Sequence, residues 1–103
     1  MTRGTTPTIS FNLPFDVSNL AVYYITVSQI FGRSKKQVLD FDAEDCSSSG
    51  RRIEVELSQE DTLALTEENP VLVQLRARST EGKAYASKEF RTTVDGILKD
   101  GVI

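Results

Sequence analysis

The chain has 103 residues, of which 12 are Lys or Arg and 15 are Asp or Glu, and this length fits one domain. It contains no histidine, no tryptophan and one cysteine, Cys46, which excludes histidine-dependent catalytic sites and any disulfide within the chain. The formal charge of −3 gives no global attraction to nucleic acid or to an anionic membrane, so we expect neither as a partner.

Residues 1–7 lack the apolar core of a signal peptide. No run approaches the ~20 apolar residues that would span a bilayer. We therefore expect neither secretion nor a transmembrane segment.

Most of the chain alternates apolar and polar residues, as strands with one buried face do. The first such run spans 8–13 and ends at Pro14, which cannot donate to a ladder. The next run, 20–29, is rich in β-branched and aromatic residues, and its first half is expected to be buried on both faces, as in a central strand. Gly32 then permits a tight reversal into a polar edge strand over 35–41.

Residues 42–50 combine charge with turn formers and are expected to form the longest loop. Clean alternation over 51–57 predicts the next strand. Ser58, followed by acidic residues, is the one signal for a helix start and predicts a short helical turn over about 59–65. Alternation then resumes over 71–79.

The segment Thr-Glu-Gly at 80–82 predicts a hairpin that returns the chain into a last strand over 83–94. Every second residue from Ala84 to Val94 shares one face. Lys88 falls in the same phase, although a lysine should not be buried unpaired. We therefore expect a β-bulge next to this lysine.

These elements predict an all-β protein: an immunoglobulin-like antiparallel β-sandwich of six to seven strands with one short helical turn. One sheet is expected to pair 8–13 with 51–57. The other sheet is expected to have the strand order 35–41, 20–29, 71–79, 83–94. Residues 1–94 would form the single β-sandwich domain, and residues 95–103, which have no clear period, would form a C-terminal tail or arm.

The acidic residues after Asp40 could present oxygens to calcium, but the EF-hand pattern fails because Asp45 stands where glycine is needed and Arg51 where the closing glutamate belongs. A solvated acidic loop is therefore favoured. Acidic neighbours should raise the pKa of the Cys46 thiol, which disfavours a reactive thiolate. Carboxylates along solvent faces offer no cleft to raise one pKa, so we expect no catalytic residue, no metal and no cofactor.

Arg76 and Arg78 are expected to point outward together, and a registered hairpin would set Tyr85 beside them. A basic face with one aromatic residue is one way to bind nucleic acid. Glu89 on the same face and the negative net charge favour ordinary cross-strand pairing instead.

Apolar residues at the predicted hairpin tip and in the tail suit contact with other proteins, because so small a domain has little to bury them. The alternative is that Phe31 folds back over its own sheet and that the tail is merely frayed. The candidate interface residues are Ile30, Phe31, Arg76, Arg78, Tyr85, Ile97, Leu98, Val102 and Ile103.

Several phrases of the sequence are familiar in combination: Arg3-Gly4-Thr5-Thr6-Pro7-Thr8, Phe11-Asn12-Leu13-Pro14-Phe15-Asp16, Leu57-Ser58-Gln59-Glu60-Asp61-Thr62, Val73-Gln74-Leu75-Arg76 and Ala86-Ser87. On these phrases the chain resembles small proteins encoded among virion-structure genes of prophages in Gram-positive bacteria. The resemblance runs nearly end to end, but its phrases are turns, caps and strand edges, so no functional residue is carried over. It departs at Phe31-Gly32, where a more polar Asn-Gly turn would be unsurprising.

The resemblance implies a non-enzymatic structural or assembly protein of a phage, a component of its tail or baseplate. Its partners would be other virion proteins and further copies of itself, and an isolated monomer is compatible with this role. It would lie in the bacterial cytoplasm during assembly and then in the virion.

A second hypothesis, from a different class, is a module that binds glycans or another ligand of the host surface. Sugars stack on exposed aromatic rings. The absence of tryptophan and the presence of only three tyrosines weigh against such a site. In this hypothesis a shallow site would use Tyr85.

Overall fold

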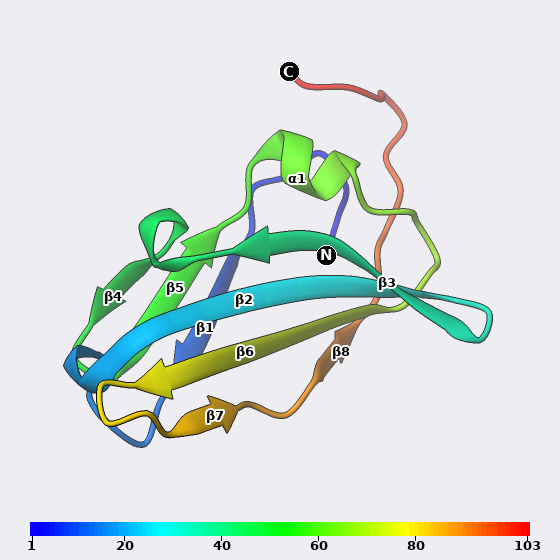
Figure 1. Ribbon diagram of the computed structural model, residues 1–103. Coiled ribbons are helices and arrows are strands. Elements are labelled where there is room, and N and C mark those ends of the chain that lie inside the picture. The colour runs from blue at the N-terminus through cyan, green and yellow to red at the C-terminus, as the bar shows by residue number, and fades with distance from the viewer.

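The computed structural model describes residues 1–103 and contains two antiparallel sheets that pack face to face (Figure 1). The antiparallel β-sandwich expected from the sequence is thus confirmed. Its strands are β1 Thr8–Asn12, β2 Leu20–Phe31, β3 Ser34–Phe41, β4 Ser47–Ser49, β5 Arg52–Glu56, β6 Val71–Ser79, β7 Ala84–Ala86 and β8 Phe90–Thr92. Its short helical segments are η1 Val17–Asn19, η2 Ala43–Asp45 and α1 Gln59–Leu63.

The smaller sheet has the strand order β1-β5-β4. In the larger sheet the order is β3-β2-β6, and both β7 and β8 pair with the far side of β6. The pairings of β1 with β5 and of β2 with both β3 and β6 are those expected from the sequence. The β2 strand is therefore central, as predicted.

Two local features raise the number of strands to eight. The first lies in residues 42–50, expected as a loop, which contain the η2 turn and the short strand β4. The Asp42 side chain accepts hydrogen bonds from the backbone N–H groups of Glu44 and Asp45, and the Asp45 side chain accepts one from Asp42 N–H. This capping box fixes the turn and directs the chain back along β5.

The second feature is a bulge that divides the last expected strand. Arg76 pairs with Ala86, whereas Val73 pairs with Phe90. The edge therefore advances four residues, from 86 to 90, where β6 covers three, from 76 to 73. Ser87 fills the gap: its N–H donates to Leu75 O at 2.8 Å, and its Oγ accepts from Leu75 N–H at 3.0 Å. The predicted bulge is thus confirmed, and it separates β7 from β8.

The core lies between the sheets and is built from the inward phase of each strand. Of the side chains of β2, those at alternating positions from Tyr23 are buried, whereas the Tyr24 side chain is 44% exposed. The expected burial of the first half of this strand on both faces was wrong, because no further layer covers the outer face of the larger sheet (Figure 1). The buried apolar residues are Phe11, Tyr23, Ile25, Val27, Phe41, Ile53, Val55, Leu57, Leu65, Val71, Val73, Leu75, Ala77 and Val94.

The predicted helical turn is present as α1. Ser58 Oγ accepts from Asp61 N–H, and the Asp61 carboxylate accepts from Ser58 N–H, which completes a capping box. The buried Thr62 hydroxyl donates to Thr5 O at 2.8 Å and so ties the N-terminal segment to the helix. No helix in the structure has the length and apolar character needed to cross a membrane.

Candidate functional site

Asp95, which the sequence placed in the tail, pairs with Thr2. We therefore call residues 96–103, which leave the sandwich beside α1, the C-terminal arm (Figure 1). The Asp100 carboxylate lies 3.5 Å from the Arg3 guanidinium. Farther along, Ile103 N–H donates to Gln59 Oε1 at 2.8 Å, and Gln59 Nε2 donates to Ile103 O at 3.1 Å. Polar contacts therefore hold the arm at more than one point.

Most apolar side chains of the C-terminal arm face solvent. Leu98 is fully exposed, Val102 is 57% exposed and Ile103 is 88% exposed. Ile97 differs because it is half-buried and lies against Gly4, where an added Cβ would stand only 3.0 Å from Ile97 Cδ1. Three of the four apolar tail residues singled out from the sequence are therefore exposed.

The β2–β3 hairpin projects beyond the rest of the larger sheet (Figure 1). Its tight turn at Gly32, where φ is +62°, is the reversal predicted from the sequence. Ile30 is half-buried, and its N–H donates to Pro70 O at 3.0 Å. Phe31 pairs only with Ser34 and is 37% exposed. The two candidate residues of the tip thus differ, and Phe31 is the more accessible.

Tyr85 does not lie beside Arg76 and Arg78, as the sequence was expected to place it. It stands opposite the buried Ala77 and therefore points toward the other sheet. Its ring packs against Phe15, with 4.9 Å between ring centroids. The expectation failed because the bulge shifts the phase of β7 relative to β8.

Aromatic rings collect at the margin of the sandwich where β1 approaches β7 and β8. Phe90 is 63% exposed and makes an edge-on contact with Phe11, with 6.1 Å between ring centroids. A cavity of about 210 Å³ beside them is lined by Phe11, Phe15, Tyr85 and other mainly apolar residues. This aromatic margin was not identified from the sequence, because it depends on how the edges of two sheets meet.

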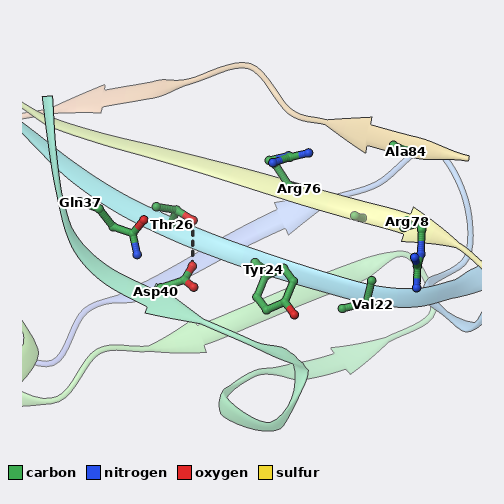
Figure 2. Close-up of a pocket in the computed structure, with 9 residues that line it drawn as sticks. Val22, Tyr24, Thr26, Gln37, Asp40, Arg76, Arg78 and Ala84 are labelled. Atoms are coloured by element: carbon green, nitrogen blue, oxygen red, sulfur yellow. Dashed lines mark hydrogen bonds between the residues drawn. The ribbon is translucent and has the colours of Figure 1, made fainter.

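A shallow hollow of about 380 Å³ lies on the outer face of the larger sheet. Figure 2 shows Arg76 rising from β6 along one side, Asp40 and Gln37 from β3 along the other, and Tyr24 between them on β2. Arg78 extends the basic side opposite Val22. We call this surface the outer hollow.

Charge in the outer hollow is divided between its two sides. Thr26 Oγ1 donates to Asp40 Oδ1 at 2.8 Å. The guanidinium groups of Arg76 and Arg78 form no ion pair with an acidic side chain. The sequence identified both arginines as outward-facing but missed Tyr24, which the apolar pattern of β2 had placed in the interior.

The acidic loop and Cys46 have structural roles. Burial raises the pKa of the Cys46 thiol to about 11, with further contributions from Asp45 and Asp42, and the direction agrees with that expected from the sequence. The carboxylates of Asp42 and Asp45 accept backbone hydrogen bonds within η2. No group of three or more acidic, Cys or His side chains is arranged to hold a metal ion.

The structure thus presents the C-terminal arm, the hairpin tip, the aromatic margin and the outer hollow as candidate contact surfaces. In comparisons with known proteins, no family model matches the chain and no curated protein sequence matches it significantly.

Proposed function

We propose that the protein is a non-enzymatic structural or assembly component of a phage particle, part of its tail or baseplate. In this role it acts through contacts with other virion proteins and with further copies of itself. The phage assignment is supported by the resemblance of the sequence phrases to small prophage virion proteins. Action through protein contacts is supported by the exposed apolar surfaces.

The C-terminal arm is the observation that carries the proposal. Its polar contacts through Asp100 and Ile103 hold the backbone, while the side chains of Leu98, Val102 and Ile103 face solvent. Several exposed apolar side chains on one short segment suit protein contact, because they can be buried together against a partner. A segment that is already held loses less conformational freedom when it binds, which favours association.

The hairpin tip and the aromatic margin add separate surfaces. Phe31 lies at the end of the projecting hairpin, whereas Phe90 lies at the margin between the sheets (Figure 1). Large exposed aromatic side chains are enriched at protein interfaces. Several separate contact surfaces suit a part that joins more than one neighbour in an assembly.

The proposal is tested with a variant that carries Leu98→Ser, Val102→Ser and Ile103→Ser. Because these side chains are exposed, the free energy of unfolding should stay within about 0.5 kcal/mol of the wild-type value. Incorporation into particles, or into a complex with the products of neighbouring tail genes, should fall at least tenfold. Lys99→Ser, in the same arm, is the matched control and should incorporate normally.

Two results would contradict this role of the arm. Normal incorporation of the triple variant would place the interface elsewhere. A loss of several kcal/mol in the free energy of unfolding would show that the three side chains belong to the protein's own core.

The outer hollow supports a second candidate function, a module that binds host-surface glycans. Tyr24 and Tyr85 are similarly exposed, at 44% and 41%, but only Tyr24 lines the outer hollow, whereas the Tyr85 ring packs on Phe15, so the aromatic residue of such a site is Tyr24. A tail or baseplate component that also contacts a host polymer would combine both functions in one domain.

A further inference from the structure

The outer hollow combines an exposed aromatic ring with groups of opposite charge on its two sides. Tyr24 and Arg76 are direct cross-strand partners, as are Val22 and Arg78. Residues two apart on one strand face the same side and lie about 7 Å apart. Arg76 and Arg78 therefore both rise from β6 on the outer face, and their side chains extend in different directions, Arg76 over β6 and Arg78 toward Val22 on β2 (Figure 2).

The opposite side of the outer hollow carries groups that bind hydroxyls. The Asp40 carboxylate accepts hydrogen bonds only, and the Gln37 amide both donates and accepts. One Asp40 oxygen already accepts from Thr26, which fixes the orientation of the carboxylate. Asp40 and Gln37 are both exposed and are thus accessible to a ligand.

The aromatic ring, the guanidinium groups and the hydroxyl-binding groups together match one class of ligand. The apolar C–H face of a sugar ring packs on an aromatic ring such as Tyr24. Arginine binds carboxylates through paired, charge-assisted hydrogen bonds. Sugar hydroxyls satisfy carboxylate and amide groups such as those of Asp40 and Gln37. The volume of about 380 Å³ falls in the range of small-molecule sites.

We propose, as a deepening of the second candidate function, that the outer hollow binds a saccharide that carries carboxylate groups. Separate carboxylate groups of the saccharide lie on Arg76 and on Arg78, a sugar ring lies on Tyr24, and hydroxyls face Asp40 and Gln37. Because the hollow is shallow and open, it accepts a stretch of a longer polymer. Arginine binds phosphate as well as carboxylate, so the test includes a phosphate polymer.

The test is a calorimetric titration of the purified chain with three ligands: an oligogalacturonate, its neutral methyl ester and a glycerol phosphate oligomer. We expect the oligogalacturonate to bind at least tenfold more tightly than either of the others. Arg76→Gln, Arg78→Gln and Tyr24→Leu should each weaken this binding at least tenfold. Each variant should melt near the wild-type temperature, because all three side chains are exposed.

Arg91→Gln is the matched control. Arg91 is exposed opposite Leu72 on the same face of the larger sheet, but it lies outside the outer hollow. Its replacement removes the same charge and should change the affinity less than twofold. An equal loss at Arg91 and at Arg76 would mean that binding follows overall charge, and it would overturn the proposal.

The remaining outcomes distinguish an error in the proposed ligand class from an error in the proposed glycan function. Equal binding of the methyl ester would overturn the carboxylate assignment and leave a glycan site standing. Tighter binding of the glycerol phosphate oligomer would replace the carboxylated sugar with a phosphate polymer. No binding of any of the three would overturn the proposed site and the glycan function that it deepens, while the assembly function would be unaffected.

Discussion

The side-chain amide of Gln29 forms a pair of hydrogen bonds with the backbone of Thr66. Gln29 Nε2 donates to Thr66 O at 2.8 Å, and Gln29 Oε1 accepts from Thr66 N–H at 2.8 Å. Nε2 also lies 3.3 Å from Asn69 O. The Gln29 residue is 0% exposed. A polar side chain thus ends the buried face of β2 and holds the connection between α1 and β6.

Replacing Gln29 with leucine should destabilise the protein by about 1–3 kcal/mol. The variant removes two partly buried hydrogen bonds between the Gln29 amide and the backbone of Thr66, and each such bond contributes about 0.5–1.5 kcal/mol. Urea unfolding of the two proteins measures the difference. Gln37→Leu, at an exposed position, should change stability by less than about 0.5 kcal/mol. Equal effects at Gln29 and Gln37 would contradict the structural role of the Gln29 amide.

The centre of the core should be sensitive to loss of volume on β6. Val73 and Leu75 are each 4% exposed, and truncation of either to alanine removes buried methyl groups and leaves a cavity. We expect each variant to lose about 1.5–4 kcal/mol in denaturant unfolding. Leu98→Ala, where the side chain is fully exposed, serves as the control and should have little effect. A loss below half a kcal/mol at both core sites would remove β6 from the centre of the core.

The bulge depends on the Ser87 hydroxyl. Ser87→Ala removes the acceptor of Leu75 N–H and should cost about 1–2 kcal/mol, because that N–H is partly buried. The exposed Ser48 of β4, replaced by alanine, provides the matched control. Hydrogen exchange at Leu75 N–H should accelerate in the Ser87 variant alone. Unchanged protection there would show that the hydroxyl does not hold the bulge.

The Cys46 thiol should react slowly with iodoacetamide. Its pKa rises from 9.0 to about 11, so near pH 8 the thiolate is about a hundredfold scarcer than in the unfolded chain. The greater nucleophilicity of the more basic thiolate offsets part of this difference. We therefore expect the native protein to react at least about tenfold more slowly than the protein in urea. Equal rates would contradict the raised pKa of the partly buried Cys46 thiol.

The same shift has a defined sign for stability. Because folding raises the pKa of Cys46, the folded state favours the protonated thiol. The resulting contribution to stability is fully present below pH 9 and is lost as the pH rises toward about 11. Cys46→Ser should remove this dependence from the alkaline part of the unfolding profile, measured as the melting temperature against pH.

Much of the fold was predictable because its signals are local. The alternation of apolar and polar residues predicted the strands, and Gly32 predicted the tight reversal. Ser58 and the acidic residues after it predicted the capped turn of α1. The burial of Gln29 was not predictable. Its position continues the inward phase of β2, but its hydrogen-bond partner is Thr66, which is distant in the chain.

The candidate surfaces were less predictable than the strands. Tyr24 belongs to an apolar run that suggested burial on both faces, and its exposure depends on the absence of a third layer above the larger sheet. The side to which Tyr85 points depends on where the extra residue of the bulge falls. Both properties arise from packing and register between strands, which a period of two does not specify.

The extra residue at the bulge also governs whether this sheet edge invites polymerisation. β7 and β8 contain only three residues each, so neither offers a long ladder of free backbone groups to a neighbouring chain. Deleting Lys88 would restore strict alternation, with Tyr85 and Phe90 still facing inward, and would fuse the two pieces into one continuous edge strand. Such a strand is a template for fibre growth. The interruption at Ser87 therefore removes this edge as a long template for the addition of a neighbouring strand.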